Sequence, residues 1–436
     1  MGAKVQEYGD FLCAADFLYF FIWCRRTVFF KHSAAGWAVT ANFAFLIHYF
    51  MKFATKVIHA GIEPDPSTGA VMTPIYQTTT YVQNAPGDHK GYEYARTQNP
   101  TRSVLETNLA ALENGTDAIC FGSGLAAQDA VIKLLKTGDE VLSVNDLYGG
   151  SYRQMVRVYG PWGLKSRYID MYDASTVESA IGPDTKLIWI ETPTNPMLNI
   201  VDIAAVCAIA REKGILTCVD NTFASPYLQN PLDLGADIVL HSATKYIGGH
   251  SDVVHGCLIV KDADLGARLR FLQNACGAVP GPQDCFLILR GIKTLHLRVQ
   301  RACENAEKIA RYLSTHPKVS KVYWPGFENH PNHAVAKKQM RMFGAMVSFD
   351  LKDNSLENAH RILSSTHLFA LAESLGGVES LIGHPASMTH ASIPREERLK
   401  VGLTDSLIRL SVGVEDADDL IEDLAAALGG MHSIQH

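Results

Sequence analysis

The sequence predicts an α/β protein with a mostly parallel β-sheet in a large domain and a smaller α/β domain after it. From Ala111 onward, apolar runs rich in β-branched residues alternate with segments of helical periodicity, as in sheets covered by helices. After about residue 297 a long amphipathic stretch leads into further short strands and a closing helical run. Polar residues also follow the first set of strands repeatedly, which is typical of a ligand site.

The individual elements of the large domain follow from these runs. Six strands are expected, at residues 117–121, 140–144, 186–191, 215–220, 237–242 and 256–260. Two amphipathic helices are expected between them, at residues 125–136 and 203–214. The second ends at Gly214, a residue suited to stopping a helix.

The chain divides into four regions on this basis. Residues 51–110 contain several prolines and threonines without a strong period, so we expect an extended arm. Residues 111–297 form the large domain, and residues 298–436 form the smaller one, with strands expected in GAMVSFDL and LIRLSVGV.

The first fifty residues differ in composition, being crowded with aromatic residues and poor in charge. Three interpretations compete: a membrane anchor or signal segment, an interaction arm, or a non-native extension. Lys31 and His32 split the apolar runs, and no cleavage site is evident. Met51 begins a stretch typical of an ordinary N-terminus, which favours a non-native extension.

Composition argues against several classes of function. The net charge of -6 and the lack of a basic cluster argue against nucleic-acid binding. Nine cysteines without CxxC pairs or zinc spacing indicate reduced thiols in a cytoplasmic protein. Four histidines, His250, His255, His384 and His390, have no carboxylates at ligand spacing, so we expect no metal site.

Polar residues follow five of the expected strands. They are Ser123, Tyr148, Asn195, Asp220 and the segment 242–245. Ligands of open α/β sheets bind beyond the carboxyl ends of strands, so five such positions in one sheet indicate a site.

The segment GSGLAA, residues 122–127, joins a strand to a helix and has three interpretations. Its glycines and the helix N-terminus suit a phosphate. It also fits GxGxxA, the dinucleotide pattern, with Asp146 about 20 residues further on for a ribose. A structural turn is the third possibility.

Lys245 lies in HSATKYIGGHSD between hydroxyl residues and glycines. Asp220 either caps a helix or pairs with a ring nitrogen, since a buried charge needs a partner. Pyridoxal 5'-phosphate (PLP) requires a lysine, an acid at its ring nitrogen and a phosphate cradle. Tyr148 is available to stack on the ring. A nicotinamide enzyme leaves Lys245 unexplained, and we keep it as a distant alternative.

Several longer segments carry a family resemblance. They are YEYARTQNPTR, SGLAA, DLYGGSYR, ETPTNP, VDNTFASP, HSATKYIGGHSD, LAESLGGVES, PASMTHASIP and LIRLSVGVED. With them the chain, from about Thr55 to Leu428, resembles the Cys/Met-metabolism family of PLP-dependent enzymes. The resemblance implies fold type I, with a seven-stranded sheet in the large domain.

The resemblance implies cofactor roles residue by residue. Lys245 would hold PLP and move protons, Asp220 would bind the ring nitrogen, and Tyr148 would stack on the ring. The remaining cofactor-binding residues would be Gly124, Leu125, Thr222, Ser242 and Thr244, with Tyr94 and Arg96 from a neighbouring subunit. Shared sites imply a dimer, and the resemblance implies that this dimer is doubled to a homotetramer, a dimer of dimers.

The resemblance also implies an amino-acid substrate. Arg409 would bind its α-carboxylate, and the other substrate residues would be Ser374, Asn195, Glu373, Arg153 and Glu93. The expected reaction is γ-elimination on L-cystathionine, giving cysteine, 2-oxobutanoate and ammonia. γ-Replacement on an O-acylhomoserine by cysteine is the alternative. Methionine-cleaving members carry cysteine where this chain has Gly150, which argues against methionine as the main substrate.

Overall fold

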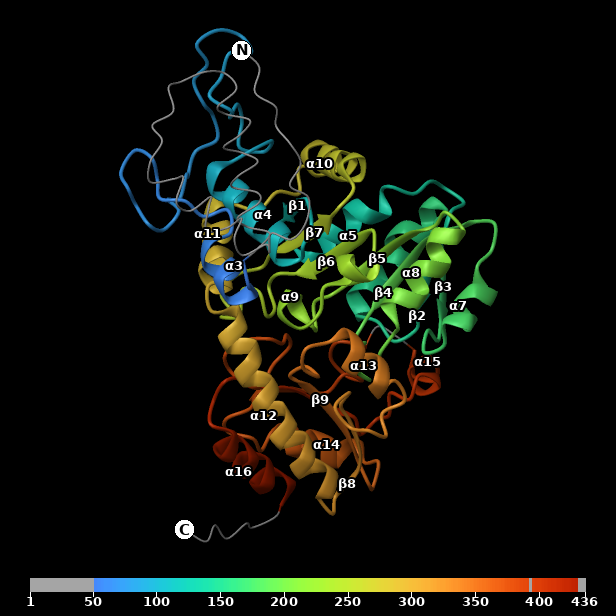
Figure 1. The fold of residues 1–436 in the computed structure, drawn as a ribbon. Coiled ribbons are helices and arrows are strands. Elements are labelled where there is room, and N and C mark those ends of the chain that lie inside the picture. The colour runs from blue at the N-terminus through green and yellow to red at the C-terminus, as the bar shows by residue number, and fades with distance from the viewer. Residues whose placement is uncertain (1–50, 392–393, 430–436) are drawn as a thin grey trace, which may run out of the picture. The chain divides into compact units, whose positions relative to one another are not determined.

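The computed structural model describes residues 51–391 and 394–429, all within one unit, Met51–His436. The expectations for residues 1–50 therefore lie outside the described residues. A large sheet of seven strands and a small sheet of five strands organise this unit (Figure 1).

The large sheet has the order β1-β7-β6-β5-β4-β2-β3. Its strands are β1 Asp117–Phe121, β2 Glu140–Val144, β3 Lys165–Ile169, β4 Thr185–Glu191, β5 Leu216–Asp220, β6 Ile238–Ser242 and β7 Gly256–Val260. Only β7 is antiparallel to its neighbours, so the sheet is mostly parallel, as predicted. Strand β3 was not predicted, because KSRYI lacks a clear apolar run.

Helices cover both faces of the large sheet, because successive side chains of its strands enter different cores. In β1, Ile119 and Phe121 join one apolar cluster, whereas Ala118 and Cys120 join another. The first cluster contains residues of α5 Gly124–Ile132, α7 Ala174–Ala180, α8 Ile203–Glu212 and α10 Ala263–Cys276. The second contains residues of α3 Phe53–His59, α4 Pro100–Leu112 and α11 Pro282–Ile292.

The N-terminal region contains helices α3 and α4, so the expectation of an extended arm over residues 51–110 is wrong at both ends. Asn99 caps α4 by accepting hydrogen bonds from the backbone N–H groups of Thr101 and Arg102, and Pro100 occupies the first turn. Proline at this position is a helix-start signal. The several other prolines of the region obscure this helix-start signal in the sequence.

The small sheet has the order β10-β11-β12-β9-β8. Its strands are β8 Val319–Tyr323, β9 Met346–Leu351, β10 Ala370–Leu371, β11 Leu381–Gly383 and β12 Ile408–Ser411. The helices after α11 are α12 Leu295–Thr315, α13 His333–Gln339, α14 Leu356–Leu363, α15 Arg395–Lys400 and α16 Ala417–Leu428. The expected strands in GAMVSFDL and LIRLSVGV are β9 and β12.

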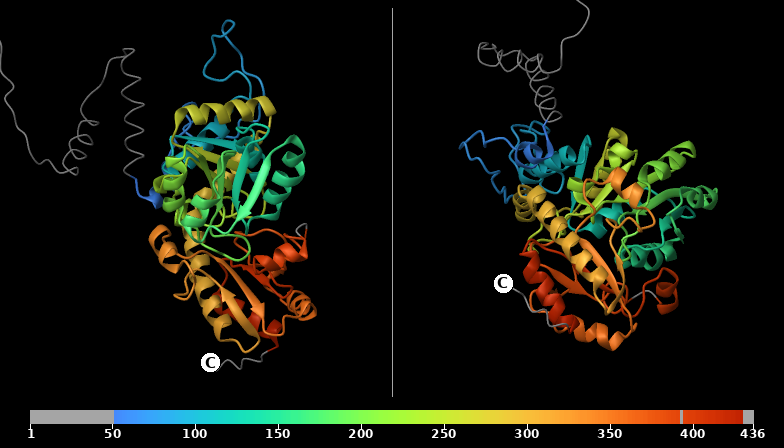
Figure 2. Two further views of the ribbon diagram at one scale, coloured as in Figure 1. Left: turned by 90° about the vertical axis from the view of Figure 1, so that its right-hand side faces the viewer. Right: turned by 60° about the horizontal axis from the view of Figure 1, so that its bottom comes forward.

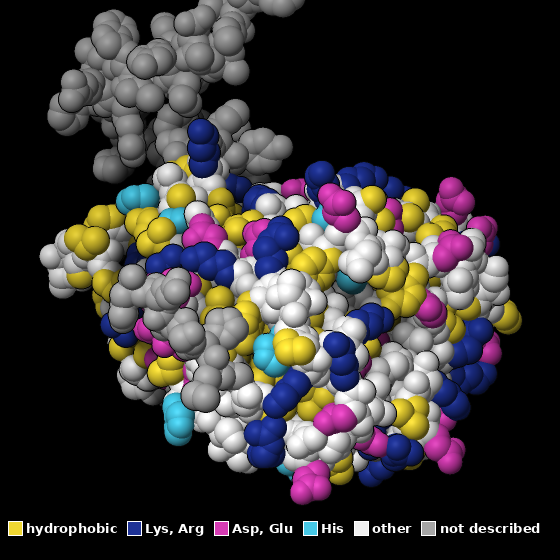
Figure 3. All heavy atoms as spheres, turned by 90° about the horizontal axis from the view of Figure 1, so that it is seen from below, with side chains coloured by type: hydrophobic (Ala, Val, Ile, Leu, Met, Phe, Trp, Pro, Cys, Tyr) yellow, Lys and Arg dark blue, Asp and Glu magenta, His cyan; other side chains and the backbone are white. Residues whose placement is uncertain are grey.

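Short turns complete the described chain: α6 Gly149–Arg153, π-helical Gln154–Tyr159, 3₁₀ Gly160–Trp162, α9 Ser225–Leu228 and 3₁₀ Pro231–Leu234. No helix among the described residues is long and apolar enough to cross a membrane. On the end of the molecule seen in Figure 3, acidic and basic side chains are interspersed.

Helix α12 runs from beside α11 to the small sheet (Figures 1 and 2). Its Arg298 also holds the turn that follows Lys245. The buried guanidinium of Arg298 donates hydrogen bonds to the carbonyl oxygens of Tyr246 and Ile247 at 2.7 and 3.3 Å. Gly249 approaches the same guanidinium with a φ of +72°, and a Cβ there would lie 1.8 Å from Nη1. Glycine is therefore required where the turn passes Arg298.

Candidate active site

The ends of five parallel strands bring the expected polar residues to one edge of the large sheet. Strands β1, β2, β4, β5 and β6 share one direction, so their carboxyl ends lie on the same side. Lys245 follows β6 in a tight turn, in which its backbone N–H donates to Ser242 O at 3.1 Å. The polar residues therefore meet at the carboxyl ends of the strands, as the sequence predicted.

The Lys245 side chain extends to the small-sheet side of the site. Its Nζ donates a hydrogen bond to Ser374 Oγ at 2.8 Å. Burial, together with the positive charge of Arg409, lowers the pKa of Lys245 to about 8, although the Glu373 carboxylate opposes this shift. The charged form still predominates near neutral pH, but the neutral amine is far more abundant there than in an exposed lysine.

Arg409 lies buried in β12 beside the lysine. Its Nη1 donates to Asn195 Oδ1 at 2.9 Å, and its Nη2 donates to Ser374 O at 3.1 Å. Burial lowers the pKa of Arg409 to about 10, which leaves the guanidinium charged at neutral pH. Ser374 thus contacts both Lys245 and Arg409, and it has a φ of 115°, which is strained for a residue with a Cβ.

Two carboxyl groups, those of Asp220 and Glu191, lie side by side at the ends of neighbouring strands. Asp220 ends β5, and its Oδ1 accepts a hydrogen bond from the Thr222 backbone N–H at 3.0 Å. Glu191 ends β4 in register with Asp220, and its Oε2 accepts a hydrogen bond from the Tyr148 backbone N–H at 3.0 Å. Burial raises the pKa of Asp220, and burial with the Asp220 charge raises that of Glu191 further.

Tyr148 precedes α6, and the residue is 40% exposed. Gly150 makes this ring position possible, because a Cβ at residue 150 would lie 2.3 Å from the Tyr148 ring. The glycine that argued against methionine as the main substrate therefore also determines where the ring lies.

The start of α5 is a candidate site for a phosphate. A Cβ on Gly124 would lie 2.9 Å from Ser242 Cβ, so the helix start and the end of β6 are in close contact. The Ser242 backbone N–H donates to Thr222 Oγ1 at 2.9 Å, which ties a second hydroxyl residue to this site. The first N–H groups of α5, including those of Gly124 and Leu125, point out of the helix start and suit a phosphate.

Thr244 is engaged within the chain. Its Oγ1 donates to His255 O at 3.2 Å and accepts from the His255 backbone N–H at 2.9 Å. The hydroxyl therefore retains one free lone pair, and it would have to leave His255 O in order to donate to a phosphate.

Three of the expected site residues, Glu93, Tyr94 and Arg96, make their contacts away from Lys245 of the same chain. Arg96 Nη1 instead donates to Asn274 O and Oδ1, at 2.6 and 3.0 Å, near the end of α10. The Tyr94 ring lies 5.8 Å from the same guanidinium, and Glu93 pairs with His89. Among the described contacts, none joins these residues to Lys245.

Two expected substrate residues lie at the exposed rim. Glu373 lines a small depression together with Arg409, Met388 and Thr389. Arg153 is exposed at the end of α6, and its positive charge acts on Tyr148. Two charged groups therefore act on Lys245: the buried guanidinium of Arg409 and the exposed carboxylate of Glu373.

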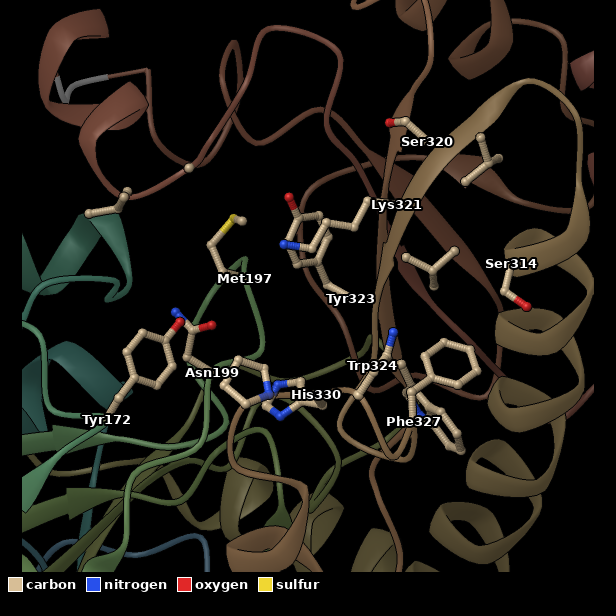
Figure 4. Close-up of a pocket in the computed structure, with 16 residues that line it drawn as sticks. Tyr172, Met197, Asn199, Ser314, Ser320, Lys321, Tyr323, Trp324, Phe327 and His330 are labelled. Atoms are coloured by element: carbon tan, nitrogen blue, oxygen red, sulfur yellow. The ribbon is translucent and has the colours of Figure 1, made fainter.

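A cavity of about 580 Å³ lies apart from these residues (Figure 4). Tyr172, Asn199, Lys321, Tyr323 and His330 are among the residues that line it. Because it contains neither Lys245 nor Asp220, it is not the site described above.

Comparison with known proteins identifies the family. The profile described as Cys/Met metabolism PLP-dependent enzyme matches residues 54–429. The chain belongs to this family. PLP is accordingly its cofactor, and its fold is fold type I.

Three relatives of this chain are named for three different activities. A cystathionine beta-lyase of Coxiella burnetii and a cystathionine gamma-lyase of Bacillus subtilis are each 54% identical, over 86% and 87% of this chain and 97% and 99% of theirs. A cystathionine gamma-synthase of Mycobacterium bovis is 51% identical over 86% of this chain and 96% of its own.

The solved structures include a cystathionine gamma-lyase from Lactobacillus plantarum complexed with L-serine. It matches with a TM-score of 0.85 and 48% identity, over 87% of this chain and 99% of that one. These comparisons place the chain in the metabolism of cysteine and methionine, and they include members named for three different activities.

The residues present fit the family's cofactor. Lys245 is a half-buried amine with a lowered pKa, Asp220 is an acid at a strand end, and the α5 start lies against Ser242. PLP requires these three groups. Asp146, the acid considered for a ribose, is buried, accepts a hydrogen bond from Met197 N at 3.1 Å and contacts the Thr194 hydroxyl. Asp146 is therefore not free to bind a ribose. The nicotinamide alternative thus lacks the acid that it requires.

Two features of the site were missed in the sequence. Glu191 was read only as the end of a strand, although an acid that ends an apolar run is the same signal that identified Asp220. The strained backbone of Ser374 has no signal in composition or spacing, because tertiary contacts impose it.

Proposed function

We propose that this protein cleaves L-cystathionine by γ-elimination, giving cysteine, 2-oxobutanoate and ammonia. The observation that carries the proposal is the position of Lys245 between two opposite charges, Arg409 on the inner side and Glu373 on the rim. An amino acid with an α-carboxylate and a distal ammonium group matches this arrangement.

Arg409 would bind the substrate α-carboxylate through a guanidinium already oriented by Asn195. Two hydrogen bonds hold the guanidinium, so little rotational freedom would be lost on binding. Ser374 would direct its carbonyl oxygen to Arg409 and its hydroxyl to Lys245. The three residues would thus place the substrate Cα beside the lysine amine.

Bound PLP supplies an electron sink that stabilises negative charge at the substrate Cα. The neutral amine of Lys245 would remove the Cα proton and then a Cβ proton, which γ-elimination requires. Its pKa of about 8 makes the neutral amine far more abundant near neutral pH than in an exposed lysine. Burial raises the pKa of the Tyr148 phenol, which would hold a proton for the departing thiolate.

Glu373 would bind the distal ammonium group of cystathionine at the rim. It acts electrostatically on both Lys245 and Arg409, so its carboxylate already belongs to the charge balance of the site. Methionine lacks the distal ammonium group and would gain nothing from Glu373. Arg153, and Glu93 of a neighbouring subunit, would complete the rim.

The active form would be a homotetramer with shared sites, located in the cytoplasm. Arg96 and Tyr94 do not reach the lysine of their own chain, which supports a role in the site of a neighbour. On this basis residues 51–110, with helices α3 and α4 at their ends, would contribute to the neighbour's active site. Residues 111–297 would form the PLP-binding domain and residues 298–436 the C-terminal domain.

β-Elimination on the same substrate is a second candidate, because a relative of equal identity is named cystathionine beta-lyase. A γ-synthase is a third, because a relative at 51% identity bears that name. Incubation with cystathionine alone, followed by chromatography of the products, separates the first two. The proposal predicts cysteine and 2-oxobutanoate, whereas homocysteine and pyruvate would indicate β-cleavage. Faster cystathionine formation from O-succinylhomoserine and cysteine would indicate a synthase.

A further inference from the structure

A second buried carboxyl group lies directly beside the acid assigned to the cofactor ring. Glu191 is the last residue of β4, is 4% exposed, and pairs in register with Asp220 at the end of β5. Register partners on neighbouring parallel strands project to the same face, and their strands lie about 5 Å apart. The two carboxyl groups are therefore neighbours at one end of the site.

The contacts of Glu191 leave part of its carboxyl group available. Its Oε2 accepts a hydrogen bond from the Tyr148 backbone N–H at 3.0 Å. Among the described residues, no donor is assigned to its Oε1. The charged groups that act on it are Asp220, Asp146 and Arg409, and His241 of the neighbouring strand β6 acts on Asp220. Two of these are acidic, so its immediate surroundings disfavour an additional negative charge.

Two carboxyl groups so close together in a buried site resist simultaneous ionisation, because their charges repel and little water separates them. A pair of this kind normally retains one shared proton. A cation placed beside the pair favours release of this proton, because the cation compensates the second negative charge.

We propose that Glu191 is a positioning residue that shares one proton with Asp220 in the cofactor-free protein and releases it to solvent when PLP binds. The protonated ring nitrogen paired with Asp220 supplies the compensating cation. The ring keeps its own proton, and the proton that leaves comes from the Glu191–Asp220 pair. The inference rests on the proposed role of Asp220 and is independent of which carbon–sulfur bond is cleaved.

The test uses Glu191→Gln in the full chain. Glutamine has the same size, and its amide oxygen still accepts the Tyr148 N–H, so only the titratable proton is removed. Calorimetric titration of the cofactor-free protein with PLP, in two buffers of different ionisation enthalpy at several pH values, counts the protons exchanged. Proton changes at Lys245 are common to both proteins and cancel in the comparison.

We expect the wild-type protein to release up to one proton more than Glu191→Gln in part of the range from pH 6 to 8.5. By linkage, wild-type affinity for PLP should then rise with pH more steeply than that of the variant, by up to about tenfold per pH unit. Equal proton counts and equal slopes across the range would overturn the inference.

Asp220→Asn provides the second arm of the test. If Asp220 binds the ring nitrogen, this variant should bind PLP weakly and should also lose the extra proton release. Weakened binding by Asp220→Asn, with an unchanged proton count in Glu191→Gln, would overturn the role of Glu191 and leave that of Asp220 standing. Unaffected binding in Asp220→Asn would instead overturn the assignment of Asp220, on which the inference rests.

Discussion

Lys245 Nζ donates a hydrogen bond to Ser374 Oγ across 2.8 Å, although 129 positions separate the two residues in the chain. The lysine follows a strand of the large sheet, whereas Ser374 lies between β10 and β11 of the small sheet. The reactive amine is therefore oriented by the second sheet, and the site requires both.

Substitution at Ser374 separates the hydroxyl from the strain of its backbone. Both Ser374→Ala and Ser374→Gly remove the contact with Lys245, and we expect both to lower kcat. Only glycine tolerates the φ of 115° without strain. We therefore expect the glycine variant to be more stable than the alanine variant by about 1 kcal/mol. Chemical denaturation measures this difference, and equal stabilities would contradict the strain argument.

Glu373→Ala should lose activity on cystathionine while sparing the weak activity on methionine. A charged hydrogen bond contributes about 1.5–3 kcal/mol, so kcat/KM for cystathionine should fall roughly ten- to a hundredfold. Steady-state rates with both substrates measure the difference. Glu307→Ala, on α12, serves as the control, because Glu307 is bonded to Arg311 of the same helix. Equal losses on both substrates would argue against a contact with the distal ammonium group.

Lys245→Met should stabilise the cofactor-free protein in a pH-dependent way. The folded state lowers the pKa of Lys245 from 10.5 to about 8, so the unfolded chain binds more protons between these values. Wild-type stability should thus rise with pH across this window, and the charged lysine should cost on the order of 3 kcal/mol below pH 8. The advantage of the methionine variant, measured by thermal unfolding, should shrink as pH increases from 8 to 10.5.

The exposed Lys337 of α13 provides the control for this experiment. Lys337→Met should leave stability nearly unchanged across the same range of pH. A constant difference between Lys245→Met and wild type would show that burial does not penalise the charged amine.

Arg96→Ala and Lys245→Ala should each be nearly inactive, yet regain activity when they are mixed and reassembled. If sites are shared, random pairing restores roughly a quarter of them, because one mixed site then receives both intact residues. Arg268→Ala, at an exposed position on α10, is the matched control and should stay active alone. Lack of recovery, with hybrid formation shown by native mass spectrometry, would mean that one chain builds each site.

The chain order of strands and polar residues was enough to predict that these residues lie at one edge of the sheet, because parallel strands bring their carboxyl ends together. Strand β3 was not predicted, since its edge position tolerates the polar sequence KSRYI. Helix α4 was missed despite its Asn99 cap. The Arg409–Asn195 and Lys245–Ser374 contacts depend on how the two sheets pack, which local sequence patterns do not encode.

Reduction of the PLP-loaded protein with borohydride, followed by peptide mapping, tests the central assignment most directly. This treatment fixes the cofactor covalently to the lysine that holds it. The structure predicts the label on Lys245, within the peptide that contains HSATKYIGGHSD, and predicts no retained label in Lys245→Ala. A label on another lysine, or its retention in Lys245→Ala, would contradict the account.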